Sequence, residues 1–501
     1  MRKPFFLPLL LLVAGLSSCN DYALPYALRS LQRGQGEEVY YANFFARNAL
    51  QTYYLWDKEV SDKLENWQEF GDPAAQVLGA RYRDASGKEI DRWTQLVPDF
   101  ARFQASVAGN SPGTYGYDFQ LTYLDKGHTR IGAVLICTYA DGPASRAGLK
   151  RGDVIVQVNG KAMTPDNYVE IVQDELLGTG HLVLTLESGR ELSMDSVSMY
   201  ENPVLLYKIF DDGSKRVAYL AYNSFTLDSY QDLITACKGF RAAGISDLIL
   251  DLRYNGGGFT MAEEFLASML APEDAVQAGE VLSMEVYNSN LMEYFASRKE
   301  DTKTYFSQDF RFQYAGKNYQ FNTRDANARA GRIFAIVTGS SASASEALLC
   351  DLKAYMPVIL VGGRTHGKFC AGLPLSATDF YTDNVKYLGS DMVEDAVRST
   401  RNMGLYVMIS RFSDKNGETL CMPDGLAPDV TVEDNPLDGC QLGDPSETML
   451  AAALSACGYA PAKRAARDAA VVRQLDAVTG APARAGDGYR ILLDRPSLPV
   501  E

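Results

Sequence analysis

A hydroxyl and an amine with the spacing expected of a nucleophile and its base occur in the second half of this 501-residue chain. Ser343 lies in a run of small residues between an apolar segment and a segment of helical character, and Lys368 follows 25 residues later. That spacing leaves room for one helix, one strand and a turn. A lysine is a poor base at its free pKa of ~10.4, but partial burial disfavours the ammonium and can bring the pKa toward ~7–8.

Ser343 taken alone has a second interpretation. Ser343 and Glu346 have the spacing of a capping box, in which the serine caps a helix and the glutamate follows three residues later. A hydroxyl at a helix N-terminus also faces unpaired N–H groups and the positive end of the dipole, which favour a developing oxyanion. Spacing alone leaves both roles open, and the pairing with Lys368 favours the nucleophile.

A third chemical element is the glycine-rich stretch that follows Asp251-Leu252-Arg253-Tyr254-Asn255. Three glycines between a predicted strand and a predicted helix form a loop whose N–H groups can point at an anion. A nucleotide-phosphate loop would need Lys-Ser/Thr after the glycines, which is missing. The better fit is an oxyanion hole that pairs the N–H of one of these glycines with the N–H of Ala344.

An alternating strand and helix pattern positions these residues. Strands alternating with helices predict crossover units and a layered α/β core. The core is expected at 200–435, with 272–330 as a polar, aromatic insertion and 436–501 as an Ala-, Asp- and Pro-rich C-terminal extension, helical where ordered. The predicted strands are 216–222, 247–252, 333–338 and 358–361, and the predicted helices are 229–243, 260–271 and 344–355.

Two further segments precede the core. Residues 38–112 are predicted to form a helical N-terminal module, because aromatic residues recur there at helical spacing. Residues 113–199 contain short strands, the Asn159-Gly160 hairpin signal and an Ala-Gly-Leu…Gly-Asp pattern, and this segment resembles a PDZ domain. The resemblance implies strand addition of an extended peptide, with a carboxylate held by the loop Gly116-Tyr117-Asp118-Phe119. Asp118 stands where the family often has glycine, and a purely structural role of the domain is the alternative.

The N-terminus has the pattern of an export signal. Arg2 and Lys3 precede an apolar run of about a dozen residues, which is shorter than the roughly 20 needed to span a bilayer. Ser17-Ser18-Cys19 resembles a bacterial lipobox, so residues 1–19 are expected to be a lipoprotein signal peptide, Cys19 its lipidation site and 20–37 a tether. Asn20 favours the outer membrane of a cell envelope, in the periplasm or facing the surface.

Composition excludes several classes of protein. The net charge of −15 and the lack of a Lys/Arg cluster argue against a nucleic-acid partner. With three histidines and no Cys-x-x-Cys, we expect no metal site and no cofactor. The seven cysteines other than Cys19 are odd in number and are expected to be mostly buried apolar groups. His366 could suggest a Ser–His–Asp triad, but no Gly-x-Ser-x-Gly elbow exists.

Together, the Asp-Leu-Arg-x-Asn-x-Gly-Gly, Ser-Ala-Ser-Ala-Ser-Glu and Gly-Lys motifs, with the closing 424–429 element, resemble the C-terminal processing (tail-specific) serine protease family with a PDZ domain, in its Bacteroidetes-type lipoprotein form. The resemblance implies a multidomain α+β protein with a crotonase-like ββα-type core. It also implies Ser343 as nucleophile, Lys368 as base, Gly256 or Gly257 with Ala344 as oxyanion donors, and protein or peptide substrates with hydrophobic C-termini.

The sequence departs from this family in the residues that orient the lysine. Relatives use an Asp on the nucleophile's helix or a Gln just after the lysine, where this chain has Ala354 and Gly372. Asp351 or Glu346 could substitute. These departures leave open a catalytically weak or inactive PDZ-containing binding lipoprotein on a protease fold, and an envelope accessory lipoprotein that binds carbohydrate is a second alternative.

Overall fold

The computed structural model describes residues 36–67, 71–459, 476–478 and 490–492. The predicted signal peptide with Cys19, and all but the last residues of the predicted tether, lie outside these residues. Within them, no helix is both long and apolar enough to cross a membrane. The seven cysteines from Cys137 to Cys457 are buried free thiols, as expected.

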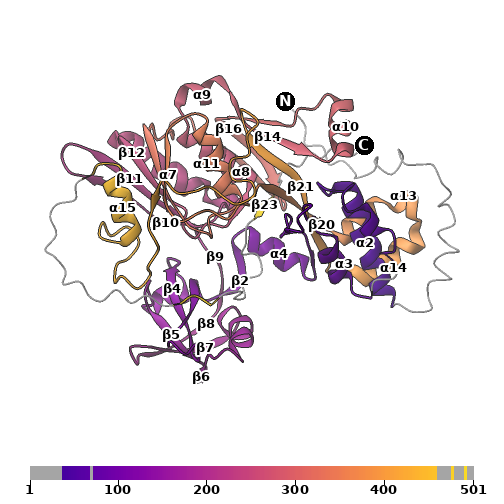
Figure 1. Ribbon diagram of the computed structural model, residues 1–501, viewed down its shortest axis with the longest axis horizontal. Helices are drawn as coiled ribbons and strands as arrows, with labels where there is room; N and C mark the ends of the chain where they lie inside the picture. The colour runs from indigo at the N-terminus through magenta and orange to yellow at the C-terminus, as the bar shows by residue number, and fades with distance from the viewer. Residues whose placement is uncertain (1–35, 68–70, 460–475, 479–489, 493–501) are drawn as a thin grey trace.

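A six-stranded sheet forms the centre of the core (Figure 1). Its order is β10 (Val204–Asp211), β11 (Arg216–Tyr222), β12 (Asp247–Asp251), β18 (Arg332–Val337), β19 (Val358–Gly362) and β22 (Val430–Thr431). The strands from β11 to β22 are parallel, and β10 is antiparallel. The predicted strands and helices of this core are confirmed to within two residues.

Both faces of this sheet are covered, which explains its continuous apolar strands. Alternate residues of β11 belong to two different hydrophobic clusters. One face packs against the crossover helices α7 (Tyr230–Ala243), α8 (Thr260–Leu270) and α11 (Ala344–Lys353). The other packs against α15 (Thr448–Ala456), so the predicted C-terminal extension supplies part of the core.

A second sheet combines strands from segments that the sequence analysis assigned to different parts of the chain. It has the order β13 (Gly257–Phe259), β23 (Arg490–Leu492), β20 (Cys370–Ser376), β21 (Gly404–Asp414), β14 (Val281–Tyr287) and β15 (Lys303–Tyr305), and β1 (Gln95–Val97) also pairs with β21. The predicted insertion therefore contributes β14 and β15 to a core sheet.

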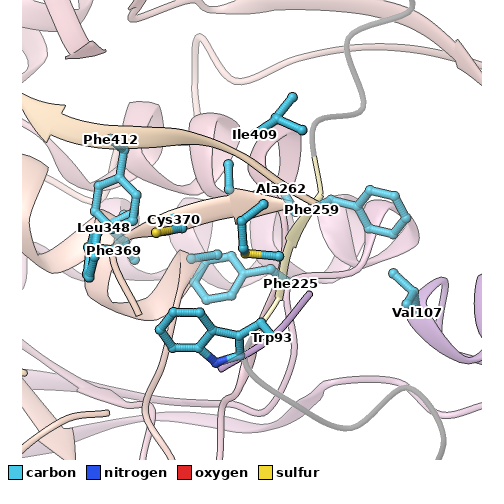
Figure 2. Close-up of a cluster of buried hydrophobic side chains, with 14 of the residues drawn as sticks. Trp93, Val107, Phe225, Phe259, Ala262, Leu348, Phe369, Cys370, Ile409 and Phe412 are labelled. Carbon is cyan, nitrogen blue, oxygen red and sulfur yellow. The ribbon is translucent and has the colours of Figure 1, made fainter. Parts of the chain in front are cut away.

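The N-terminal segment is helical, as predicted, but it is not a separate module. Helix α2 (Glu37–Tyr53) packs against α14 (Ser390–Thr400) and β21, and its apolar residues belong to the same hydrophobic cluster as the core. Figure 2 shows Trp93 and Val107 of this segment in one cluster with Phe259, Leu348 and Ile409. The aromatic stripe of the sequence thus faces the core. Further elements of the segment are η1 (Ser61–Leu64), α3 (Pro73–Ala80) and α4 (Phe100–Val107).

The segment predicted as a PDZ domain has its own sheet and its own apolar cluster. The strand order is β3 (Tyr117–Tyr123), β4 (Ile131–Thr138), β5 (Val154–Val158), β7 (His181–Leu186) and β8 (Glu191–Asp195), with β6 (Lys161–Ala162) completing the Asn159-Gly160 hairpin. The helix of this domain is α6 (Tyr168–Glu170) continued by the π-helical turn η3 (Ile171–Leu176). The pair β2 (Asn110–Thr114) and β9 (Val197–Tyr200) connects the domain to the rest.

The remaining elements lie in connections and in the insertion. They are α5 (Pro143–Arg146), η4 (Leu227–Ser229), α9 (Glu273–Ala278), α10 (Ser289–Arg298), β16 (Asp309–Tyr314), β17 (Lys317–Asn322), α12 (Ala377–Asp383) and α13 (Val385–Leu388).

A buried ionic network links the PDZ-like domain, the core and the C-terminal segment. Arg253 is 1% exposed and binds both carboxylate oxygens of Glu447, at 2.7 and 2.9 Å, as well as Asp251 at 2.8 Å and Asp434 at 3.0 Å. Arg151 of the PDZ-like domain reaches the same Asp434 at 2.7 Å. The arginine of the Asp-Leu-Arg motif is therefore a structural cation at the end of β12.

We predict that Arg253→Met lowers the free energy of unfolding by about 3–5 kcal/mol, because removing one partner strands buried carboxylates without a counter-charge. Urea denaturation measures this change. Arg216→Met is the matched control: its ion pair with Asp211 is about half exposed, and its loss should cost at most ~1 kcal/mol. Equal losses in the two variants would contradict the structural role of Arg253.

Candidate active site

Ser343 precedes α11 in a backbone conformation that is rare for a residue with a side chain. Its φ is 64° and its ψ is −115°. Its Oγ is buried, makes no capping hydrogen bond and has no hydrogen-bond partner in the described part of the chain. Backbone strain of this kind costs about 1–3 kcal/mol and is concentrated at functional sites. The Glu346 half of the predicted capping box is present, since this carboxylate accepts the Ser343 N–H, so the helix start is capped while the serine hydroxyl stays unbonded.

Glu346, the third residue of α11, joins the serine to the lysine loop. Its Oε2 accepts the backbone N–H groups of Ser343 (3.1 Å) and Lys368 (2.8 Å). Its Oε1 accepts the Gly367 N–H (2.7 Å) and the Thr365 hydroxyl (2.5 Å). Burial raises the pKa of Glu346 although these four donors act in the opposite direction. Because one oxygen atom is shared by both backbones, Ser343 and Lys368 are neighbours in space.

Lys368 is completely buried, and an aromatic enclosure surrounds its amine. Nζ lies 3.2 Å from the hydroxyl of Tyr406, over the ring of Trp93 at 5.3 Å and over the ring of Tyr406 at 5.1 Å. Ser343 Oγ is not hydrogen-bonded to this amine. Catalytic hydrogen bonds are often loose in the free enzyme and tighten when substrate binds.

Tyr406 occupies the space beside Gly372, where related proteases carry the Gln that orients the lysine. It lies on β21, next to β20, which carries Gly372. A Cβ atom at Gly372 would lie 2.2 Å from the Cζ of Tyr406 and 2.4 Å from its hydroxyl. A larger residue at 372 is therefore incompatible with this tyrosine. No motif identifies Tyr406, and the pairing of β20 with β21 would have been needed to find it.

The glycine-rich loop is tied to the serine segment through Asn255. Its carbonyl accepts the Ala342 N–H (3.1 Å) and the Ser345 hydroxyl (2.9 Å). Its side-chain Oδ1 accepts the N–H of Gly257 (2.9 Å). One of the predicted oxyanion donors is thus engaged. The other two are Gly256 and Ala344, and Ala344 is the first residue of a helix, where the N–H lacks an intrahelical acceptor.

The 424–429 element packs against the lysine loop. Gly425 has a φ of 81°, and a Cβ atom there would lie 2.0 Å from the carbonyl oxygen of Thr365. Gly367 has a φ of 89°, and its Cβ would lie 2.3 Å from the carbonyl oxygen of Pro423. The Asp429 carboxylate accepts the N–H of Leu360 on β19 at 2.8 Å. These close approaches explain the glycines on both sides.

Asp351 does not orient the lysine. It is completely buried, and neither carboxylate oxygen has a hydrogen-bond partner in the described part of the chain. It lines a cavity of about 20 Å³ between α11, α8 and the second sheet, with Thr260, Glu263, Glu264, Ser283, Glu285, Thr304, Ala344, Ala347, Ala371 and Phe412. Burial, followed by the charge of Glu263, raises the pKa of Asp351 well above its usual value. The expectation that Asp351 contacts Lys368 is wrong.

His366 does not form a triad with Ser343. Its Nδ1 lies 3.3 Å from the carbonyl oxygen of Gly339, and Ser343 Oγ has no hydrogen bond to it. Burial, with the nearby charges of Arg92 and Lys368, lowers the pKa of His366 to about 4. The imidazole is therefore neutral at neutral pH. Separately, the described residues contain no group of His, Cys, Asp or Glu arranged to hold a metal ion.

The predicted peptide-binding loop of the PDZ-like domain is partly engaged. The Gly116 N–H donates to the Thr114 hydroxyl at 3.0 Å. Tyr117 is completely buried, and its hydroxyl donates to the Leu176 carbonyl at 2.9 Å, whereas Phe119 packs at the edge of the domain's apolar cluster. The Asp118 carboxylate accepts from the Tyr139 hydroxyl at 2.6 Å and from the Asn223 side chain of the core at 3.1 Å. Carboxylate capture by this loop stays a prediction.

We predict that Glu346→Gln lowers the free energy of unfolding by about 1–3 kcal/mol, because the amide NH₂ meets backbone donors and leaves them unsatisfied. Hydrogen exchange at the Gly367 and Lys368 amides should accelerate in parallel. Glu394→Gln, on the exposed side of α14, is the control and should stay within ±0.5 kcal/mol. An unchanged exchange rate at residues 367 and 368 would exclude the bridging role.

We predict that Asp351→Asn stabilises the protein at neutral pH by about 1–2 kcal/mol, because it removes a buried carboxyl whose ionisation burial opposes. A carboxyl with a raised folded-state pKa contributes full stability below its unfolded pKa of about 3.9, and that contribution is lost as the pH rises. Denaturation at pH 4 and pH 7.5 should therefore show a smaller difference for the variant than for the wild type.

The half-buried Glu264→Gln, at the rim of the same cavity, is the control and should have a smaller effect. A clear loss of stability in Asp351→Asn would contradict the absence of a partner for this carboxylate.

Comparison with known proteins agrees with this geometry. Residues 216–432 match the family model of Peptidase family S41, and residues 137–177 match a PDZ domain model. A probable CtpA-like serine protease of Staphylococcus aureus is 25% identical over 226 residues, which cover 45% of this chain and only 40% of that protein. The chloroplastic C-terminal processing peptidase of Tetradesmus obliquus is 24% identical over 345 residues, covering 64% of this chain and 67% of that protein.

A solved structure shows the same fold. A crystal structure described as a putative S41 protease of Bacteroides fragilis superposes with a TM-score of 0.60 at 22% sequence identity, covering 82% of this chain and 97% of the other. The chain thus has a multidomain α+β fold, in which residues 216–432 are similar to the family S41 peptidase core and residues 137–177 to a PDZ domain.

Proposed function

We propose that the protein is a serine endopeptidase of the C-terminal processing type, with Ser343 as nucleophile and Lys368 as base. The observation that carries the proposal is the Glu346 carboxylate, which holds both backbones on one oxygen atom. The backbones of a strained serine with an unbonded hydroxyl and of a buried lysine therefore lie side by side at the N-terminus of one helix. The match of residues 216–432 to the model of Peptidase family S41 supports the same proposal.

In this proposal, neutral Lys368 takes the proton as Ser343 Oγ attacks the scissile carbonyl carbon. The N–H groups of Gly256 and Ala344 stabilise the oxyanion of the tetrahedral intermediate. The C–N bond then breaks, the leaving amine receives the proton from Lys368, and an ester to Ser343 remains. A water molecule, deprotonated by the same amine, attacks that ester; the C–Oγ bond breaks, Ser343 Oγ takes the proton back from Lys368, and the acyl product leaves as a carboxylic acid. No cofactor takes part.

We further propose that Tyr406 is the positioning residue of the lysine, in place of the Gln of related proteases. Its hydroxyl lies 3.2 Å from Nζ, and its ring occupies the space beside Gly372. The tyrosine reaches the amine from the neighbouring strand, so the missing side chain at 372 does not leave the lysine without a polar contact.

The proposed setting is the cell envelope, with the chain anchored by a lipid on Cys19 in the outer membrane. The lipobox-like Ser17-Ser18-Cys19 pattern supports this part of the proposal. Protein or peptide tails are the proposed substrates, and the PDZ domain would present their hydrophobic C-termini.

Ser343→Ala should abolish hydrolysis of an unfolded polypeptide, with a loss of about 10⁴-fold or more, because no other group can form the ester. Cleavage is measured by mass spectrometry of the products, and the folded state is checked by thermal unfolding. Activity that survives this change would exclude the dyad. A wild-type protein without activity that still binds peptides would instead favour the alternative of an inactive PDZ-containing binding protein.

Tyr406→Phe should lower kcat about tenfold with little change in KM, because one hydrogen bond to the lysine is lost while the ring is kept. The ammonium also loses an acceptor, so the acidic limb of the pH–rate profile should move to lower pH. Tyr381→Phe is the control: its hydroxyl bonds to the Tyr41 carbonyl away from the site. A drop in kcat without any movement of the limb would contradict a positioning role.

A further inference from the structure

Strand β23 lies in the second sheet between β13 and β20. Its residues pair in parallel with β13, with Arg490 opposite Gly257, Ile491 opposite Gly258 and Leu492 opposite Phe259. On its other side, Leu492 is opposite Gly372 of β20. The short yellow strand near Phe259 in Figure 2 is β23. A piece of the C-terminal tail is thus inserted between the strand of the oxyanion loop and the strand that follows Lys368.

A second piece of the same tail lies on the PDZ domain. Strand β3 begins at Tyr117, within the predicted peptide-binding loop, and is the edge strand of the domain's sheet. Residues 476–478 form an antiparallel bridge with this edge, with Ala477 opposite Thr122. The Tyr123 N–H donates to the Asp476 carbonyl at 2.8 Å, and the Val478 N–H donates to the Leu121 carbonyl at 3.1 Å.

At this second contact, the Val478 side chain is buried in the domain as the apolar anchor of a bound peptide would be. Val478 is 8% exposed and belongs to the domain's apolar cluster, together with Leu121 of β3 and Ile171 and Val172 of the helix. Strand addition to a free edge combined with one apolar anchor is the way in which PDZ domains hold peptides.

We propose that the C-terminal tail of this chain is an intramolecular ligand of its own protease. Residues 476–478 occupy the edge strand of the PDZ domain, and residues 490–492 occupy the position between β13 and β20, beside Gly257 and Gly372, which we call the cleft. The tail therefore competes with protein substrates at both surfaces. This inference rests on the proposed function, and it makes the substrate an extended strand that runs parallel to β13 and β20.

The energetics favour a displaceable ligand. Each contact is only three residues long, and a single backbone hydrogen bond contributes about 0.5–1.5 kcal/mol net. The tail is nevertheless held at a millimolar effective concentration by its covalent link to the same chain. A free substrate must therefore exceed this concentration or bind through more contacts, and a polypeptide that engages the PDZ edge and the cleft together does the latter.

The first test is Ile491→Pro in the full-length protein. Proline lacks the N–H and fits poorly between two paired strands, so it should release β23 from the cleft. Ile491→Val is the matched control, because it keeps the N–H and the β-branched side chain. The expected result is a rise of at least fivefold in kcat/KM for a fluorogenic peptide with Ile491→Pro and none with Ile491→Val. An unchanged or lower kcat/KM in Ile491→Pro would overturn the proposal.

The second test does not depend on catalysis. Hydrogen–deuterium exchange is measured in the Ser343→Ala background, with and without Ile491→Pro. The amides of Gly257–Phe259 and Cys370–Ser376 should exchange faster when proline is present, whereas those of β11 and β12 should not change. Equal exchange in the two proteins would mean that β23 does not occupy the cleft. Faster exchange with proline, together with a wild-type protein that shows no peptidase activity, would refute the proposed function and leave the tail contact standing.

Discussion

The structure of the site depends on the Glu346 carboxylate. Four donors from two separate segments converge on its two oxygens, and all four lie at the start of α11 or in the loop before β20. The strained Ser343 backbone, the glycine at 367 and the packing of the 424–429 element all serve this convergence. A carboxylate can satisfy so many donors only when ionised, and burial works against ionisation. The site is thus held by an anion whose hydration has been replaced by backbone N–H groups.

Much of this arrangement could be predicted from the sequence, because the chemistry lies in local motifs. The Ser-Ala-Ser-Ala-Ser-Glu run, the glycine-rich loop and the strand-helix alternation identify the core elements to within two residues. Tyr406 could not be found in this way. It lies on β21, far along the chain from Lys368, and only the register of β20 against β21 places it at the amine. The prediction that Asp351 orients Lys368 was wrong for a different reason. Asp351 lies one turn from the position of the orienting Asp in related proteases, but its side chain lines the cavity between α11, α8 and the second sheet.

The domain boundaries show a related limit of sequence interpretation. An amphipathic stripe indicates that a helix buries one face, but it does not indicate which element that face packs against. Helix α2 buries its aromatic face on α14 and β21, and the insertion supplies β14 to the sheet that carries Tyr406. Segments without a clear strand-helix alternation in the sequence therefore pack on or belong to the second sheet. A single hydrophobic cluster includes residues of all of them.

The ionic network around Arg253 has a mechanical consequence. Arg151 of the PDZ domain and Arg253 of the core share Asp434, which sits on the segment leading into α15. All three side chains are at least nine-tenths buried. A hinge motion of the PDZ domain would separate Arg151 from this carboxylate and expose unlike charges that are now desolvated together. The domain is therefore clamped at one point, and any motion that admits a large substrate must pivot about this point rather than pull away from it.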